Sequence, residues 1–257
     1  MIVKYREEGW EIVTQRSHGI VAAQIGFNWK FGELPAHWVE VMMSIAEHDD
    51  AENELDGENL LTATGGPLNY DMKKFDLEHC MNLASLTIVK SRTIALLTSL
   101  HMEFLYASAK PENKKAVRFL ADQKKLRSQW MKELSITEKQ TMELYNLLQW
   151  CDALSLLICK DDMQEEQRKT EISVGPHNVT YYLTKIDEHT LTVEPWPFAC
   201  EKFPVYYERR HLPRLVFSSS AEFRDQFLAS GVEMRSWDIK KGTGKKRARN
   251  ATVLVES

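Results

Sequence analysis

Residues 147–158 read Leu-Leu-Gln-Trp-Cys-Asp-Ala-Leu-Ser-Leu-Leu-Ile, and this apolar run carries a single carboxylate, that of Asp152. At helical spacing Asp152 falls on one inward stripe with Tyr145, Leu148, Leu156 and Cys159. An inward carboxylate needs a cation, hydrogen-bond donors or a proton, and aspartate is also a poor mid-helix residue. The run therefore predicts a buried helix that carries a functional group.

Amphipathic helices are expected on both sides of this run. Apolar residues at period 3.6 predict helices over 17–29, 35–48, 76–91, 92–107, 112–133, 138–159 and 220–229. Ser17 is expected to cap the first helix, and Pro35 fits the first turn of the second. The helices between Ser17 and about Lys160 should pack together as a bundle.

Extended segments are expected at both ends of the chain. Residues 2–5 and 10–14 flank a turn and predict a hairpin, and β-branched and aromatic residues predict strands over 179–183, 190–193, 205–207 and 232–234. Because an isolated hairpin is marginal in water, we expect it to pair with the C-terminal strands. The predicted fold class is α+β, with an all-helical bundle and a small antiparallel β-sheet layer.

This pattern predicts three parts. Residues 16–165 form the helical part, residues 1–15 with 170–240 form the β-rich layer, and 241–257 form a basic tail. Six of the ten residues from Lys240 to Arg249 are basic, which is typical of a mobile solvated tail or of a weak contact with a polyanion. The segment Pro195–Phe198 is expected to pack the sheet against the helices, and the long loop Asp56–Asp76 could cover a site.

Composition limits the class of protein. The chain has 257 residues, a net charge of -4 and a pI near 6.1, which give no overall attraction to nucleic acid or to an anionic membrane. No signal peptide or transmembrane run is visible, so a cytoplasmic protein is expected. The four cysteines form no metal-binding spacing and are typical of buried thiols in a reducing compartment. P-loop, Rossmann, nucleophile-elbow and H-E-x-x-H motifs are absent from the sequence.

Histidines and aspartates recur along the helical part, most of them on apolar faces. In chain order they are His18, the doublet His48-Asp49, His79, His101 and Asp152. A buried polar group without a partner is costly, and a shared metal ion would compensate several of them at once. Neutral imidazole and carboxylate suit iron, manganese, zinc or nickel. The doublet ends a predicted helix, where the backbone can turn enough for both side chains to reach one ion.

Together these residues resemble the HD-domain superfamily of helical metalloproteins over roughly residues 17–160. The resemblance implies an HD-like bundle and two divalent transition-metal ions. It implies that His48 and Asp49 bind the metals and are the catalytic pair, with Asp49 able to bridge the two ions. His18 and Asp152 would then hold one ion, and His79 and His101 the other.

A second likeness covers nearly the whole chain. The start Met1-Ile2-Val3, the segment Glu47–Asp50, Ser99-Leu100-His101 and Pro195–Phe198 resemble an uncharacterised bacterial family of unknown function (DUF3891-like). That likeness implies no activity.

Three functions follow as expectations from the HD resemblance. The first is a metal-dependent phosphohydrolase acting on a phosphorylated small molecule or nucleotide, the second a di-iron oxygenase on the same ligands, and the third a non-catalytic HD-scaffold binding protein. One departure weakens the first: many HD enzymes follow the doublet with Gly-Lys, whereas Asp50-Ala51-Glu52-Asn53 stands here. A cation for an anionic substrate would then come from elsewhere, with Lys73, Lys74 and Arg92 as candidates.

Overall fold

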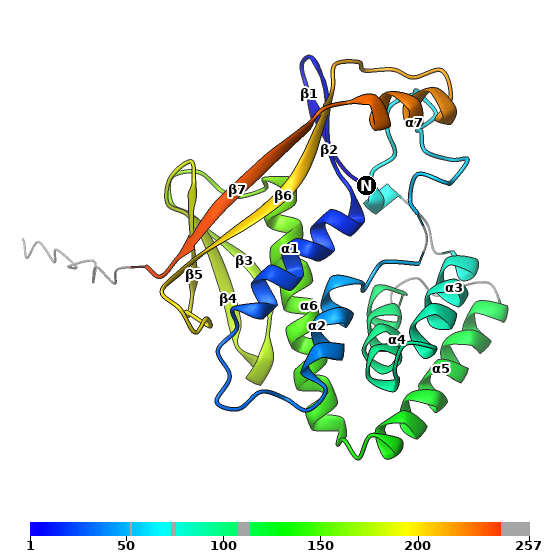
Figure 1. The fold of residues 1–257 in the computed structure, drawn as a ribbon, viewed down its shortest axis with the longest axis vertical. Helices are drawn as coiled ribbons and strands as arrows, with labels where there is room; N and C mark the ends of the chain where they lie inside the picture. The colour runs from blue at the N-terminus through cyan, green and yellow to red at the C-terminus, as the bar shows by residue number, and fades with distance from the viewer. Residues whose placement is uncertain (52, 73–75, 107–113, 243–257) are drawn as a thin grey trace, which may run out of the picture.

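The computed structural model describes residues 1–51, 53–72, 76–106 and 114–242 (Figure 1). Within these residues, seven strands form one sheet in the order β1-β2-β6-β7-β5-β4-β3. The strands are β1 (Ile2–Arg6), β2 (Gly9–Val13), β3 (Lys169–Val174), β4 (Thr180–Lys185), β5 (Thr190–Glu194), β6 (Lys202–Leu212) and β7 (Val232–Lys240). Neighbouring strands are antiparallel except β5 and β7, which run parallel.

The predicted fold class, an HD-like all-helical bundle with a small antiparallel β-sheet layer, is wrong. The structure is a mixed α/β fold built on a seven-stranded mixed sheet. The sequence pattern underestimated this sheet because β6 and β7 extend to 11 and 9 residues and carry charged side chains on their outer positions. Strand β3 was not predicted from the sequence, because it is an edge strand with a single buried position. The expected pairing of the hairpin with a C-terminal strand is confirmed, through β2 and β6.

Seven α-helices and two short 3₁₀ turns occur in the described ranges. The helices are α1 (Gln15–Phe27), α2 (Trp38–Ala46), α3 (Leu77–Ile88), α4 (Arg92–Tyr106), α5 (Lys114–Glu133), α6 (Glu138–Lys160) and α7 (Ser220–Ala229), and the turns are η1 (Tyr70–Met72) and η2 (Pro176–Asn178). The helices fall close to the predicted ranges, with two corrections at their starts. Thr14, not Ser17, caps α1 and accepts a hydrogen bond from the Ser17 N–H. Helix α2 begins after His37, whose left-handed backbone breaks the helix predicted from Pro35.

Helices α1 and α6 lie along the sheet, and α2 to α5 extend from them on the side away from it (Figure 1). The main hydrophobic core joins α1 and α6 to the strands, so the helical and β-rich segments share one core. Trp150 of α6 is fully buried there, with its ring 5.0 Å from that of Trp29 and 5.1 Å from that of Tyr181. The segment after β5 packs on the end of α1 as expected, because the Lys30 N–H donates to the Pro197 carbonyl at 2.9 Å.

A glutamine fixes α1 against the sheet. Strand β2 pairs with β6 only over residues 210–212 of β6, which leaves the preceding backbone of β6 open on that side. The Gln24 side chain occupies this edge: its amide donates to the Tyr206 carbonyl at 2.8 Å and accepts from the Tyr206 N–H at 3.0 Å. An unpaired strand edge is thereby satisfied by a helix, which holds α1 in a defined position.

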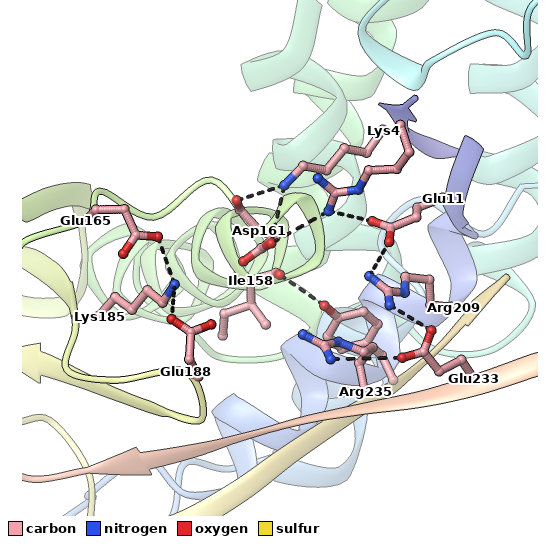
Figure 2. Close-up of polar contacts among 12 residues, drawn as sticks. Lys4, Glu11, Ile158, Asp161, Glu165, Lys185, Glu188, Arg209, Glu233 and Arg235 are labelled. Atoms are coloured by element: carbon pink, nitrogen blue, oxygen red, sulfur yellow. Dashed lines mark hydrogen bonds and ion pairs between the residues drawn. The ribbon is translucent and has the colours of Figure 1, made fainter. Parts of the chain in front are cut away.

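The C-terminal end of α6 is anchored by the polar network in Figure 2. Asp161, the left-handed C-cap of α6, accepts hydrogen bonds from Lys4 through its carbonyl at 3.1 Å and its carboxylate at 3.3 Å. The Tyr207 hydroxyl donates to the Ile158 carbonyl at 3.3 Å. Cationic and hydroxyl donors at a helix C-terminus satisfy its free carbonyls, so these contacts fix α6 to the hairpin and to β6.

The described part of the loop 56–76 packs against α7 and the hairpin. Leu55 and Leu60 share a second small core with Phe223 and Phe227 of α7. Arg224 of α7 donates to the Leu55 carbonyl at 2.6 Å. Among the helices of the described residues, none is both long and apolar enough to cross a lipid bilayer.

Candidate metal centre

The fold brings five of the six predicted ligands together. They come from four elements: His18 from α1, His48 and Asp49 from the turn after α2, His101 from α4 and Asp152 from α6. They form two groups that could each hold an ion, one of His18, His48 and Asp152 and one of His48, Asp49 and His101. Within each group the ligand atoms lie within 4.8 Å of one another.

The first group is a tight triangle. The two imidazole Nε2 atoms of His18 and His48 are 3.2 Å apart, and they lie 3.3 Å and 3.2 Å from Asp152 Oδ1. Two ligands of a tetrahedral ion with bonds of about 2.0–2.1 Å lie about 3.3–3.4 Å apart. The three donor atoms thus already have the mutual spacing that a tetrahedral ion requires.

The second group is wider and depends on Asp49. Asp49 Oδ2 lies 3.6 Å from His48 Nε2, and its Oδ1 lies 3.8 Å from His101 Nε2. The other ring nitrogen of His48 bonds to the Ile45 carbonyl at 2.9 Å, so His48 has one nitrogen left and can serve one ion only. If His48 binds with His18 and Asp152, Asp49 and His101 remain for a second ion.

His79 lies on α3, half-buried, and belongs to neither group. The sequence placed it on an inward stripe with Phe75, Leu83, Leu86 and Val89. On α3 the fully buried positions are Cys80, Leu83 and Thr87, so the inward face is rotated by one residue from the predicted stripe. Leu86 and Val89 are exposed, and Phe75 lies outside the described residues.

The centre is buried except at Asp49. The side chains of His18, His48 and His101 are at most 1% exposed and that of Asp152 is 12% exposed, whereas the Asp49 side chain is 27% exposed. Asp49 is therefore the ligand of the cluster that lies nearest to solvent.

Charges of opposite sign face each other in the cluster of His18, His48, Asp49, His101 and Asp152. Burial alone would lower the pKa of His48, but the negative charges of Asp49 and Asp152 outweigh it and raise this pKa to about 10. Burial alone would raise the pKa of Asp152, but His48 and the hydrogen bond from His18 hold it well below its ordinary value. Burial alone would also raise the pKa of Asp49, but the nearby His48 and His101 outweigh burial and lower it. Burial and the nearby His48 lower the pKa of His101. A proton on His48 thus occupies the place that a cation would take.

Three contacts that the sequence did not reveal position the ligands. The Gln15 amide donates to Asp49 Oδ2 at 3.2 Å. The His48 Nδ1 donates to the Ile45 carbonyl, which turns its Nε2 toward the cluster. Gly19 lets α1 approach the end of α2, because a Cβ atom at this position would lie 2.2 Å from the Ala46 carbonyl oxygen. A glycine directly after His18, in the interior of a predicted helix, was the one available signal for this contact.

Several buried polar atoms around the centre lack a hydrogen-bond partner within the described residues. They are His18 Nδ1, His101 Nδ1, Gln15 Oε1 and the Tyr145 hydroxyl oxygen. Unpaired buried groups are uncommon in native proteins, and each calls for an explanation, of which a bound ion or water is one. Burial, followed by the charges of Asp152 and Glu103, raises the pKa of Tyr145, so its hydroxyl stays protonated.

Of the three cationic residues expected to bind an anionic substrate, the structure describes only Arg92. Arg92 lies at the start of α4, where its Nε donates to Glu133 of α5 at 2.9 Å. Lys73 and Lys74 lie outside the described residues, as does most of the basic segment at the C-terminus. Arg92 is thereby engaged in a surface ion pair.

Comparison with known proteins gives a family without an assigned activity. No curated protein and no solved structure matches the chain. The HD resemblance therefore has no support from these comparisons. One family matches residues 1–214, a region that includes all five clustered ligands. The chain belongs to the family described as "Protein of unknown function (DUF3891)".

Proposed function

We propose that the protein is a metal-dependent phosphohydrolase acting on a phosphorylated small molecule or nucleotide. His18, His48 and Asp152 would hold one divalent ion, and Asp49 with His101 would offer a weaker site for a second. The observation that carries the proposal is the triangle of three buried donor atoms from three separate elements, with edges of 3.2 to 3.3 Å. The proposal rests on this site and not on membership of the HD superfamily.

The donor set fits a transition metal. Imidazole nitrogen and carboxylate oxygen suit iron, manganese, zinc and nickel, and the cluster lacks the all-oxygen ligands typical of magnesium or calcium sites. Burying two carboxylates is costly unless positive charge accompanies them. An ion at the triangle would supply that charge in place of the His48 proton.

Bound divalent ions would lower the pKa of a coordinated water and polarise a phosphoryl oxygen. The chain itself contributes orientation. Gln15 and the Ile45 carbonyl fix Asp49 and His48, and the buried walls exclude solvent from all but the Asp49 side. With only the first ion bound, Asp49, the most exposed carboxylate of the cluster, would serve as the acceptor for a proton from a water molecule there.

The test begins with metal content. The purified protein is stripped with a chelator, reloaded separately with Mn²⁺, Fe²⁺, Zn²⁺ and Ni²⁺, and analysed by mass spectrometry for bound metal. Each form is then assayed on p-nitrophenyl phosphate and on a panel of nucleoside phosphates. We expect at least one tightly bound ion per chain and phosphate release that depends on it.

Variants locate the activity. His48→Ala and Asp152→Ala should each abolish tight metal binding and hydrolysis. His189→Ala is the matched control, because His189 is exposed in the turn between β4 and β5. Wild-type protein that retains no metal after reloading would overturn the proposal. Loading with iron under anaerobic conditions separates the oxygenase alternative, which predicts a mixed-valent pair and consumption of dioxygen without phosphate release.

A further inference from the structure

Tyr145 is a buried tyrosine whose hydroxyl has no hydrogen-bond partner in the part of the chain that the structure describes. It lies on α6 and is 5% exposed, and its hydroxyl oxygen finds no hydrogen-bond partner among the described residues. Tyr207, also 5% exposed, shows the usual arrangement, since its hydroxyl donates to the Ile158 carbonyl. A buried hydroxyl that is left unpaired calls for a specific explanation, such as a ligand that completes its hydrogen bond.

The position of Tyr145 connects it to the metal centre. It stands two helical turns before Asp152 on the same face of α6. Its ring centroid is 6.3 Å from that of His101 and 6.4 Å from that of Phe104. The Asp152 carboxylate acts electrostatically on the Tyr145 hydroxyl. Tyr145 therefore borders the His101 side of the cluster, where Asp49 opens to solvent.

The cluster itself offers carboxylates but needs a hydrogen-bond donor to bind an anionic substrate. Its carboxylates, Asp49 and Asp152, are hydrogen-bond acceptors that repel a phosphoryl oxygen. A phenol is a neutral donor, so it can bind an anionic oxygen without adding charge to a buried site.

From the geometry we infer that Tyr145 is a substrate-contacting residue, whose hydroxyl donates a hydrogen bond to an oxygen of the phosphoryl group bound at the metal centre. This inference rests on the proposed phosphohydrolase function. According to this inference, the substrate binds next to the side chains of α6 and α4, the helices that carry Tyr145 and His101.

The test compares Tyr145→Phe with Tyr207→Phe, which removes a buried phenol hydroxyl that bonds to the Ile158 carbonyl near the C-terminal end of α6. Metal content is measured by mass spectrometry, inorganic phosphate binding by calorimetry, and turnover with p-nitrophenyl phosphate. Tyr145→Phe should keep the wild-type metal content while phosphate affinity or kcat falls about 10- to 100-fold, the usual effect of losing one hydrogen bond to a charged group. Tyr207→Phe should leave both unchanged.

Thermal unfolding of the metal-free variants gives an independent reading. Tyr145→Phe should be at least as stable as the wild type, because it removes an unpaired hydroxyl, whereas Tyr207→Phe loses a made hydrogen bond and should melt at a lower temperature. Tyr145→Phe with unchanged phosphate affinity and kcat, or with a loss of stability equal to that of Tyr207→Phe, would overturn the inference alone. Wild-type protein that binds neither metal nor phosphate would instead overturn the proposed function and, with it, the role of Tyr145.

Discussion

The Nε2 atom of His48 governs the charge balance of the cluster. Its Nδ1 is used by the Ile45 carbonyl, and its Nε2 faces Asp152 at 3.2 Å and Asp49 at 3.6 Å. Two carboxylates facing one ring nitrogen require a positive charge there. That charge is a proton in the metal-free protein and would be a metal ion in the loaded one.

The stability of the metal-free protein and its affinity for metal should therefore depend on pH with opposite signs. The pKa of His48 is raised from 6.5 to about 10 in the folded protein, so its stabilising contribution is complete below pH 6.5 and is lost as the pH rises toward 10. The Tm of chelator-treated protein should therefore fall between pH 6.5 and 8.5, a range that ends near the ordinary thiol pKa of about 8.5 and well below that of phenols. Metal affinity should rise over the same range, because the ion displaces this proton.

His48→Gln supplies the control for both measurements. It removes the titrating group, so the metal-free Tm should become flatter over this pH range and tight metal binding should be lost. A wild-type metal-free Tm that stays constant or rises from pH 6.5 to 8.5 would contradict the charge assignment.

At the level of elements, the cluster depends on how closely α1 approaches α2. Gly19 faces the Ala46 carbonyl, and a Cβ atom would lie 2.2 Å from that oxygen. Gly19→Ala must therefore push the two helices apart, which separates His18 from His48. We expect a loss of about 1–3 kcal/mol in the free energy of unfolding, although alanine is the better helix former by about 1 kcal/mol. Tight metal binding should weaken with it.

Chemical denaturation and metal titration measure both effects. Gly32→Ala is the matched control, because a Cβ atom at position 32 meets nothing within 4 Å. Its stability should stay within about 0.5 kcal/mol of the wild type. Gly19→Ala with wild-type metal affinity would show that the helix contact does not position the ligands.

The helices were predictable from the sequence because each has an apolar face long enough to show its period. His18, His101 and Asp152 could be assigned to the interior for the same reason, since they lie on those faces. His79 shows the limit: a shift of one residue in the inward face of α3 moves it out of the fully buried set. Contacts between elements, such as those of Gly19 and Gln15, have no period and could not be predicted from one sequence.

The sheet was harder to predict because its strands depend on tertiary pairing. Strand β3 has one buried residue, and β7 exposes Val232 and Met234 while burying Trp237 and Ile239. Such strands lack a clean alternation of polar and apolar residues, and their pairing with adjacent strands stabilises them. The parallel pairing of β5 with β7 joins segments separated by β6 and α7, which no local signal encodes.

On the scale of the whole molecule, α1 and α6 supply the link between sheet and cluster. Both helices bury residues in the core that they share with the strands, and both carry a ligand of the first group. Melting of the sheet would remove the support of His18 and Asp152 together. The metal centre and the sheet should therefore be stabilised as one cooperative unit.

Thermal unfolding tests this coupling. Far-UV circular dichroism reports helices and strands, and fluorescence reports the seven tryptophans, among them Trp29 and Trp150 of the shared core. Metal at 100 times its Kd adds about 2.7 kcal/mol, which should raise Tm by roughly 5–10 °C for both signals together. His48→Ala should show a single transition without the metal-dependent shift. If metal instead moved only the dichroism signal, or if the two signals gave separate transitions, the ligands would belong to a helical unit that folds independently of the sheet.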